Sequence, residues 1–286
     1  MDIQAATSIL TADPNYRVLR RINGPKPLID VQSWDPYWKT VAVLDCETTG
    51  LHPEGHQIIE LSIGLLHLDN AGWVHSYDEP RTWLEEPEWP LSEEIAALTG
   101  LTDEMLSGQA ISDEEVAMTL QSADLLVSWN AAFDARFFER RFPQLRGLCW
   151  GCAMTEVDWK ARGLEPGKQS HVLMQQGYFY DAHRAGDDVA ALMTGLAHPV
   201  SNGMLPIAEL YRTASRQSAV VWARYSHFDA KDHLKARGYR WQPEARCWWT
   251  EVDEHQIEDE REWLRALDHR IQPDIVTVDW TNRHRN

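Results

Sequence analysis

Between residues 41 and 197, short apolar runs alternate with segments of helical periodicity, and this alternation restricts what the chain can fold into. The runs VAVLD (41–45), IIELSIGLLHL (58–68) and DLLVSW (124–129) have the length and composition of buried strands. A turn at residues 69–72, DNAG, leads from the second run into WVHSY and predicts a hairpin. Strands followed by alternating helices and strands predict a mixed sheet with helices on its faces, in the α/β class.

Helical spacing of apolar residues marks four further segments: residues 91–98, 112–121, 134–142 and 186–197. Ser92 and Ser112 stand at the start of the first two segments, and acidic residues follow each of them. We therefore expect both serines to be helix N-caps. Pro143 directly follows the third segment and predicts its end.

The length of 286 residues suits one large domain with a smaller one. We expect an N-terminal strap at residues 1–39, a main domain at 40–198, a linker at 199–215 and a small α+β module at 216–286. Within the module, the runs SAVVWARYS, FDAKDHLKARG, YRWQPEARCWWTEV and DEHQIEDEREWLRAL predict the order βαββα.

Charge and composition exclude several classes of protein. The net charge is −17, from 27 basic and 44 acidic residues, which argues against a protein that coats nucleic acid nonspecifically. Carboxylates that hold metal ions would also count as negative in such a sum. No apolar run is long enough to span a bilayer, no secretory signal is evident, and four cysteines make no disulfide framework. We expect a cytoplasmic protein.

Two carboxylates stand at the exit of the first strand. Asp45 and Glu47 are two residues apart, so on a strand they project from the same face. No Lys or Arg follows within six residues, and neighbouring carboxylates repel each other. A solvated strand end is one explanation of such a pair. The alternative is a divalent metal ion held by oxygen ligands.

A metal site needs further ligands, and two later segments contain them. Asp134 lies where a buried strand meets a helix, an edge at which α/β proteins place their sites. His183 precedes a helix that carries Asp187 and Asp188. Five residues of helix turn through about 500°, so His183 and Asp188 cannot share a helical face. They converge only if His183 lies on the loop before the helix.

The segments DCETTG (45–50), NAAFD (130–134) and HRAGDD (183–188) resemble, in order and spacing, the three motifs of the DnaQ-like 3′–5′ exonucleases of the DEDDh subclass. The resemblance covers about residues 40–197, and ALTGLTDEML (97–106) is similar to the segment between the first two motifs. It implies a ribonuclease-H-like mixed sheet flanked by helices. One departure is Trp129, at a position that is often histidine in the family.

By this resemblance, the chain is an enzyme that hydrolyses phosphodiester bonds at the 3′ ends of single-stranded DNA or RNA. It would use two divalent metal ions, Mg²⁺ or Mn²⁺, and His183 would be the general base. The spacing of the family selects Asp188 rather than Asp187. The implied metal ligands are Asp45, Glu47, Asp134 and Asp188.

Residues beside the acids are candidates for substrate binding. Thr48, Thr49 and Gly50 could hold the terminal nucleotide through backbone amides and hydroxyls, and glycine allows a close approach of the backbone. The resemblance suggests Leu51 as an apolar wedge under the last base; ordinary loop packing is the alternative. Asn130 is predicted to shape the site.

The C-terminal module is locally basic: residues 216–249 carry seven Lys or Arg against three acids, interleaved with aromatic residues. This pattern is typical of a single-strand binding platform, although a small domain also needs large aromatics for its core. The predicted contacts to nucleic acid are Lys231, Lys235, Arg237, Arg240 and Trp241.

Two other functions remain open. The protein could be a proofreading subunit that acts only with a polymerase partner, or a noncatalytic binding protein on a degenerate fold. Five intact catalytic positions weigh against the second alternative.

Overall fold

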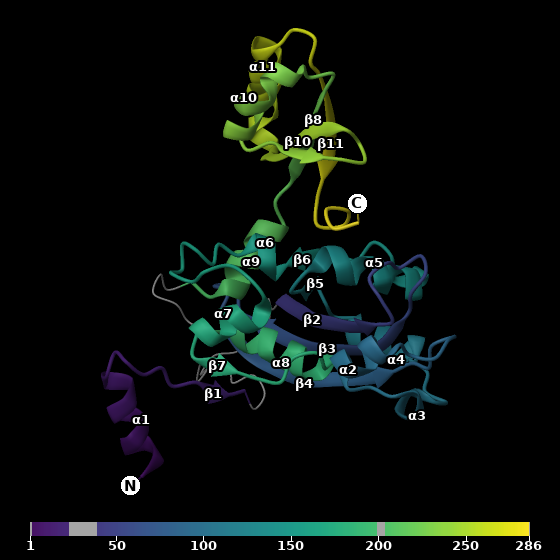
Figure 1. The fold of residues 1–286 in the computed structure, drawn as a ribbon, viewed down its shortest axis with the longest axis vertical. Helices are drawn as coiled ribbons and strands as arrows, with labels where there is room; N and C mark the ends of the chain where they lie inside the picture. The colour runs from purple at the N-terminus through teal and green to yellow at the C-terminus, as the bar shows by residue number, and fades with distance from the viewer. Residues whose placement is uncertain (1, 23–38, 199–203, 286) are drawn as a thin grey trace. The chain divides into compact units, whose positions relative to one another are not determined.

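The computed structural model describes residues 2–22, 39–198 and 204–285. The chain divides into two units, the first comprising Met1–Ala214 with His284–Asn286 and the second Ser215–Arg283 (Figure 1). In the described ranges, no helix combines the length and the apolar character that crossing a membrane requires.

The first unit is built on a five-stranded sheet with the order β4-β3-β2-β5-β6. Its central strand, β2, pairs antiparallel with β3 and parallel with β5, so the sheet is mixed. The outer pairs are antiparallel for β3 with β4 and parallel for β5 with β6. This arrangement confirms the predicted ribonuclease-H-like α/β sheet and the predicted hairpin. The strands span Lys39–Thr48 (β2), Ile58–Leu68 (β3), Val74–Leu84 (β4), Leu125–Ser128 (β5) and Trp150–Cys152 (β6).

Helices accompany the sheet, and a short parallel pair, β1 (Arg20–Arg21) with β7 (Tyr178–Phe179), lies apart from it. Both predicted N-caps are confirmed, since Ser92 Oγ accepts from the backbone N–H of Ile95 and Ser112 Oγ from that of Glu115. The α-helices span Ile3–Ala12 (α1), Glu93–Thr99 (α2), Asp103–Leu106 (α3), Asp113–Leu120 (α4), Ala131–Arg141 (α5), Ala153–Glu156 (α6), Gln169–Gln175 (α7), Ala185–Leu196 (α8) and Pro206–Ala214 (α9), and a 3₁₀ turn spans Pro143–Leu145 (η1).

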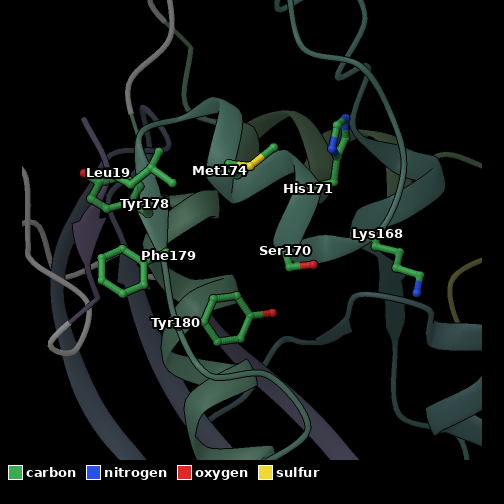
Figure 2. Close-up of a pocket in the computed structure, with 8 residues that line it drawn as sticks. All are labelled: Leu19, Lys168, Ser170, His171, Met174, Tyr178, Phe179 and Tyr180. Carbon is green, nitrogen blue, oxygen red and sulfur yellow. The ribbon is translucent and has the colours of Figure 1, made fainter. Parts of the chain in front are cut away.

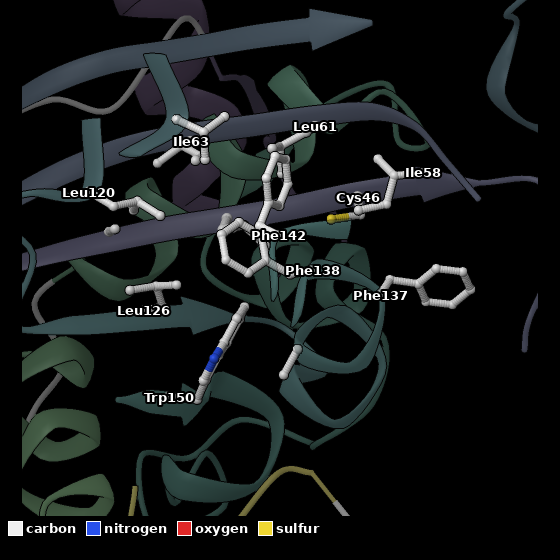
Figure 3. Packing of buried hydrophobic residues seen from close by; sticks show 14 of the residues in the cluster. Cys46, Ile58, Leu61, Ile63, Leu120, Leu126, Phe137, Phe138, Phe142 and Trp150 are labelled. Atoms are coloured by element: carbon white, nitrogen blue, oxygen red, sulfur yellow. The ribbon is translucent and has the colours of Figure 1, made fainter. Parts of the chain in front are cut away.

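The two faces of β2 have different environments because side chains alternate along a strand. Leu44 and Cys46 belong to an apolar cluster with Phe138 and Trp150, in which Cys46 lies beside Ile58 (Figure 3). The opposite face of the sheet receives α8 at very short range. A Cβ at Gly64 on β3 would come within 2.4 Å of Met193 Sδ, so this glycine permits the approach of the helix. The apolar face anchors the strand, and the face toward α8 carries Asp45 and Glu47.

The predicted linker, residues 199–215, differs from the structure over much of its length. Residues 199–203 lie outside the described residues, as do 23–38 of the predicted strap. From Pro206 the chain forms α9, in which Ile207, Leu210 and Ala214 are buried. These residues recur at helical spacing, and proline is well suited to the first turn of a helix, so a segment that begins with proline can be helical.

The second unit contains a four-stranded antiparallel sheet with the order β11-β8-β10-β9. The predicted hairpin is present as β9 and β10, but the order is βαββαβ because a further strand, β11, follows the last helix. Pro273 within β11 masks the strand pattern, and proline is tolerated there because β11 is an edge strand. The elements span Ser218–Arg224 (β8), Phe228–Ala230 (η2), Lys231–Ala236 (α10), Arg240–Gln242 (β9), Cys247–Asp253 (β10), Glu254–Gln256 (η3), Ile257–Leu267 (α11) and Gln272–Val278 (β11).

Candidate active site

Three carboxylates converge at the end of β2. Asp45 and Glu47 project from one face of this strand, and Asp188 comes from the first turn of α8. One ligand atom from each of the three lies within 4.8 Å of the other two. Across residues 2–22, 39–198 and 204–285, this is the one group of three or more His, Cys, Asp or Glu with such spacing. Segments more than 140 residues apart in the sequence thus form a single acidic cluster.

Asp188 is held by donors on both of its carboxylate oxygens. The hydroxyl of Tyr180 donates to Oδ1 at 2.9 Å, and the backbone N–H of His183 donates to Oδ2 at 2.8 Å. Gln169 Nε2 donates to the backbone oxygen of Asp188 at 2.9 Å, and Gln169 also lies 3.0 Å from the Tyr180 hydroxyl. These bonds orient the carboxylate toward the cluster without adding a positive charge.

Asp134 contacts β2 from helix α5. It lies in the first turn of α5, is 4% exposed, and accepts a hydrogen bond at 3.2 Å from the backbone N–H of Cys46. It is not one of the three carboxylates that share the 4.8 Å spacing. The negative charge of Asp134 nevertheless helps to raise the pKa of Asp45, so Asp134 interacts electrostatically with the cluster.

His183 occupies the loop immediately before α8 and has a left-handed backbone, with φ of +72°. Such a conformation is costly for a residue with a Cβ and persists where neighbouring contacts hold it, often at functional sites. Here the contact is its own N–H bond to Asp188. The His183 side chain is exposed, as is that of Asp187, whereas Asp188 is partly buried.

The carboxylates disturb one another electrostatically. Burial raises the pKa of Asp45 well above its usual range, and the negative charges of Asp134 and Asp188 add to the effect. Burial and the charge of Asp188 raise the pKa of Glu47 to about 7. Burial likewise raises the pKa values of Asp134 and Asp188. Ionisation of all four carboxyl groups is therefore unfavourable without a counter-charge, and a bound cation would relieve this repulsion.

The donor set fits a hard divalent cation. Its ligand atoms are carboxylate oxygens, the ligands that Mg²⁺, Mn²⁺ and Ca²⁺ prefer, and neither sulfur nor imidazole nitrogen takes part in the close group. Close spacing and mutual repulsion together give this group the character of a metal-binding cluster.

An ion pair that was not predicted from the sequence supports the start of α8. Glu60 on β3 is 1% exposed and accepts from Arg184 Nη2 at 2.8 Å and from the backbone N–H of Ala185 at 2.9 Å. Arg184 lowers the pKa of Glu47, so it is the cation that opposes the effect of burial there. An acid within the apolar run of residues 58–68 was the sequence signal that could have revealed Glu60.

The threonine hydroxyls predicted to hold substrate are engaged within their own loop. Thr48 Oγ1 donates to the backbone oxygen of Gly50 at 2.7 Å, and Thr49 Oγ1 accepts from the N–H of Gln57 at 3.0 Å. The space beside Gly50 is filled by His56, whose ring atoms would lie 2.3 Å from a Cβ at that position. The loop is thereby internally braced. The Thr48 O–H is used within it, whereas Thr49 Oγ1 accepts and its O–H can still donate.

Leu51 and Asn130 differ from these residues in being available. Leu51 is 74% exposed, so loop packing does not account for it. Asn130 stands at the N-cap of α5, yet its side chain makes no capping hydrogen bond. Trp129, the departure from the family pattern, packs against Trp159 with ring centroids 5.8 Å apart.

A cavity of about 550 Å³ adjoins the residues that hold Asp188. Tyr180 lines this cavity together with Lys168 and His171 (Figure 2). The remaining lining residues are Leu19, Ser170, Met174, Tyr178 and Phe179. Tyr180 is thus shared between the cavity and the acidic cluster.

In the second unit, the five residues predicted to contact nucleic acid have different environments. Arg237 forms an ion pair with the buried Glu260 at 3.0 Å, which gives it a structural role. Lys231 Nζ lies 4.2 Å from the ring centroid of Phe228. The other three are exposed: Lys235, Arg240 and Trp241.

Comparison with solved structures finds exonucleases bound to DNA. Exonuclease X in complex with 5′-overhanging duplex DNA matches with a TM-score of 0.40 and 20% identity, over 59% of this chain and 99% of that one. Exonuclease I of E. coli in complex with a dA16 oligonucleotide matches with a TM-score of 0.43 and 16% identity, over 66% of this chain and 49% of that one.

Sequence relatives include a subunit of DNA polymerase III and DNA polymerases III of the PolC type. The epsilon subunit of Pasteurella multocida is 32% identical over 143 residues, which are 45% of this chain and 53% of the subunit. The PolC-type polymerase of Thermotoga petrophila is 32% identical over 133 residues, 45% of this chain and 9% of the polymerase. The chain thus spans about half of the first relative and under a tenth of the second.

A family model decides the assignment. The model of the RNase_T family, described as "Exonuclease", matches residues 42–195, which include all three predicted motifs and more than half of the chain. This match agrees with the resemblance to DnaQ-like exonucleases inferred from those motifs. The chain therefore belongs to the exonuclease family.

Proposed function

We propose that this exonuclease removes nucleotides one at a time from the 3′ ends of single-stranded DNA or RNA, with two divalent ions, Mg²⁺ or Mn²⁺, as cofactors. The observation that carries the proposal is the cluster of Asp45, Glu47 and Asp188, with ligand atoms within 4.8 Å of one another. With Asp134 beside them, these residues would hold the ions. When bound, the ions would supply a nucleophilic water at neutral pH and neutralise charge on the phosphate and the leaving oxygen.

His183 would act as the general base. Its exposed side chain belongs to a loop whose backbone is bonded to Asp188, so the imidazole is tethered beside the cluster. An imidazole is the most common general base in enzymes and can accept the proton of the attacking water. Tyr180 and Gln169 would keep Asp188 oriented during the reaction, as partners of metal ligands commonly do.

The loop after β2 would receive the terminal nucleotide. Leu51 is exposed and could pack under the last base. The Asn130 side chain makes no capping hydrogen bond to α5, so it could contact the nucleotide. The Thr48 O–H is already bonded to Gly50 and the Thr49 N–H to the backbone oxygen of Gln57, so contacts to the nucleotide would come from the Thr49 O–H and the backbone N–H of Gly50.

A second function is favoured by the names of the relatives, which are the epsilon subunit of DNA polymerase III and a PolC-type DNA polymerase III. In this alternative the chain would be a proofreading subunit with a polymerase partner. An exonuclease that is inactive alone and becomes active when a polymerase is added would support it over the first proposal.

The test uses 5′-labelled single-stranded DNA and RNA, offered to the purified protein with Mn²⁺, with Mg²⁺ or with a chelator. A metal-dependent ladder that shortens from the 3′ end is expected. Asp45→Ala and Asp188→Ala should each reduce the rate by about 10²-fold or more. Asp187→Ala is the matched control, because Asp187 neighbours Asp188 but is exposed, and it should retain activity. Cleavage that persists in chelator, or that begins at the 5′ end, would contradict the proposal.

A further inference from the structure

The second unit lies outside the matched family segment, residues 42–195. Trp241 pairs with Trp248, which packs on the cluster that contains Leu234 of α10, so both rings lie on the α10 side of the sheet. Two of its aromatic side chains are strongly exposed there: Phe228 by 72% and Trp241 by 48%. Burial of large aromatic rings is favourable, so their exposure is not explained by the core of this unit.

Cations lie directly against these rings. Lys231 Nζ is 4.2 Å from the ring centroid of Phe228, and Lys235 Nζ is 5.9 Å from that of Trp248. The rings of Trp248 and Trp241 meet edge to face, with centroids 5.5 Å apart. Trp248 is half-buried and packs on the apolar core of the unit, so it anchors the group.

These contacts form a continuous strip. Lys231 and Lys235 are four residues apart on α10, and side chains at this spacing are neighbours on one helical face. The strip therefore places two cations between aromatic rings, in the order Phe228, Lys231, Lys235, Trp248 and Trp241. We call these five residues the α10 strip.

Within the described part of the chain, Lys231 and Lys235 form no ion pair within 4.0 Å, and the acid between them on α10, Asp232, is exposed. The acid nearest in sequence to Phe228, Asp229, faces His227 at 3.0 Å. The strip thus presents positive charge in a protein whose net charge is −17.

Two basic residues predicted to bind nucleic acid do not belong to the strip. Arg237 is engaged with Glu260, which also accepts a hydrogen bond from Tyr239. Arg240 lies over the ring of Trp249, at 4.4 Å. Since Arg240 precedes Trp241 on β9, its side chain emerges on the opposite face of the sheet.

We propose that the α10 strip binds single-stranded nucleic acid, with Phe228 and Trp241 stacking on bases and Lys231 and Lys235 contacting phosphates. Rings available for stacking require unpaired bases, which a duplex keeps inside its own stack. The proposal rests on the proposed function for its choice of substrate, because a strand held here is the class of molecule that the exonuclease site would shorten.

The test measures binding of the full chain to 5′-labelled dT20 and rU20 by fluorescence anisotropy, in chelator so that no cleavage occurs. Lys231→Gln/Lys235→Gln should weaken binding about tenfold and reduce the slope of log K against log salt by about 1.4, or about 0.7 for each phosphate that a lysine no longer neutralises. Phe228→Ala and Trp241→Ala should each weaken binding about tenfold, while Trp241→Tyr should restore most of the affinity.

Arg261→Gln/Arg265→Gln is the charge-matched control, because it removes two cations of α11 outside the strip and should leave affinity unchanged. Phe228→Ala removes a ring that is 72% exposed, so circular dichroism should show an intact fold in that variant. Folded strip variants with the affinity and salt slope of the parent protein would overturn the proposal, as would equal binding of duplex.

The rate of trinucleotide cleavage in Mn²⁺ measures the activity of the exonuclease site alone. Strip variants should cut it at the parental rate. Failure of the parent protein to cut any substrate would reject the proposed function, whereas normal cutting with unaltered strand binding by the variants would reject only the role of the strip.

Discussion

The backbone N–H of His183 donates a 2.8 Å hydrogen bond to Oδ2 of Asp188. These two residues could not have met on one face of a helix, and the structure brings them together by placing His183 on the preceding loop with φ of +72°. The proposed base and a proposed metal ligand are therefore coupled through the backbone. A change in the orientation of Asp188 should also move the loop that carries His183.

Loss of the Tyr180 hydroxyl should impair the site without unfolding the protein. Tyr180→Phe removes the donor to Asp188 Oδ1, and loss of such a partner typically costs about 10–100-fold in metal affinity or activity. Titration of nuclease activity with Mn²⁺ would measure the shift. Tyr178→Phe is the matched control: Tyr178 lines the same cavity, but its hydroxyl lies 3.4 Å from His198. Equal effects of both changes would contradict this role.

Without metal, stability should fall as pH rises toward neutrality. The pKa of Glu47 is raised from 4.5 to about 7 by burial and by Asp188, so between these values the folded protein binds more protons than the unfolded chain. The free energy of unfolding then decreases with increasing pH across that window. Thermal melting in chelator from about pH 4.5 to about pH 7.5 would measure it.

Two comparisons isolate the cause of this pH dependence. Glu47→Gln, which cannot ionise, should make the fall less steep, and the raised pKa values of Asp45, Asp134 and Asp188 account for the remainder. Mg²⁺ or Mn²⁺ should raise the melting temperature most at the upper end of the window, because the cation competes with protons for the carboxylates. A melting temperature of the Glu47→Gln protein that falls as steeply as that of the parent would assign the effect to another group.

Removal of Arg184 should destabilise the first unit. Arg184→Ala leaves Glu60, which is 1% exposed, without its cation. Breaking a buried pair costs about 3–5 kcal/mol, and since the Arg184 side chain is 42% exposed we expect about 2 kcal/mol. Urea unfolding would measure the change. Arg136→Ala, which breaks a pair exposed at both partners, should cost under about 1 kcal/mol.

The loop after β2 should not tolerate a side chain at Gly50. In Gly50→Ala the new Cβ would lie 2.3 Å from the ring of His56, so the ring or the loop must shift. We expect about tenfold lower nuclease activity, because the same loop follows Asp45 and Glu47 directly. Gly55→Ala is the control within this loop, since a Cβ there meets nothing within 4 Å. Identical rates for the two variants would show that the position of His56 is irrelevant to the site.

The sequence by itself determined the local features of this protein. Apolar runs predicted β2, β3 and β5, serines followed by acids predicted two N-caps, and three motifs identified the family. These properties depend on neighbouring residues, whose spacing is visible in one dimension. The acids at residues 45 and 47 share a face for the same reason.

Only the tertiary structure decided which distant groups surround those acids. Tyr180 and Gln169 have no sequence pattern that links them to Asp188, and the pair of Glu60 with Arg184 joins residues 124 positions apart. In the second unit, folding alone distinguishes Arg237, paired with Glu260, from Lys231 and Lys235, which form no ion pair with the residues that the structure describes. Hydrogen bonds and ion pairs of this kind depend on how the helices and strands pack, and the spacing of residues in the sequence does not reveal that packing.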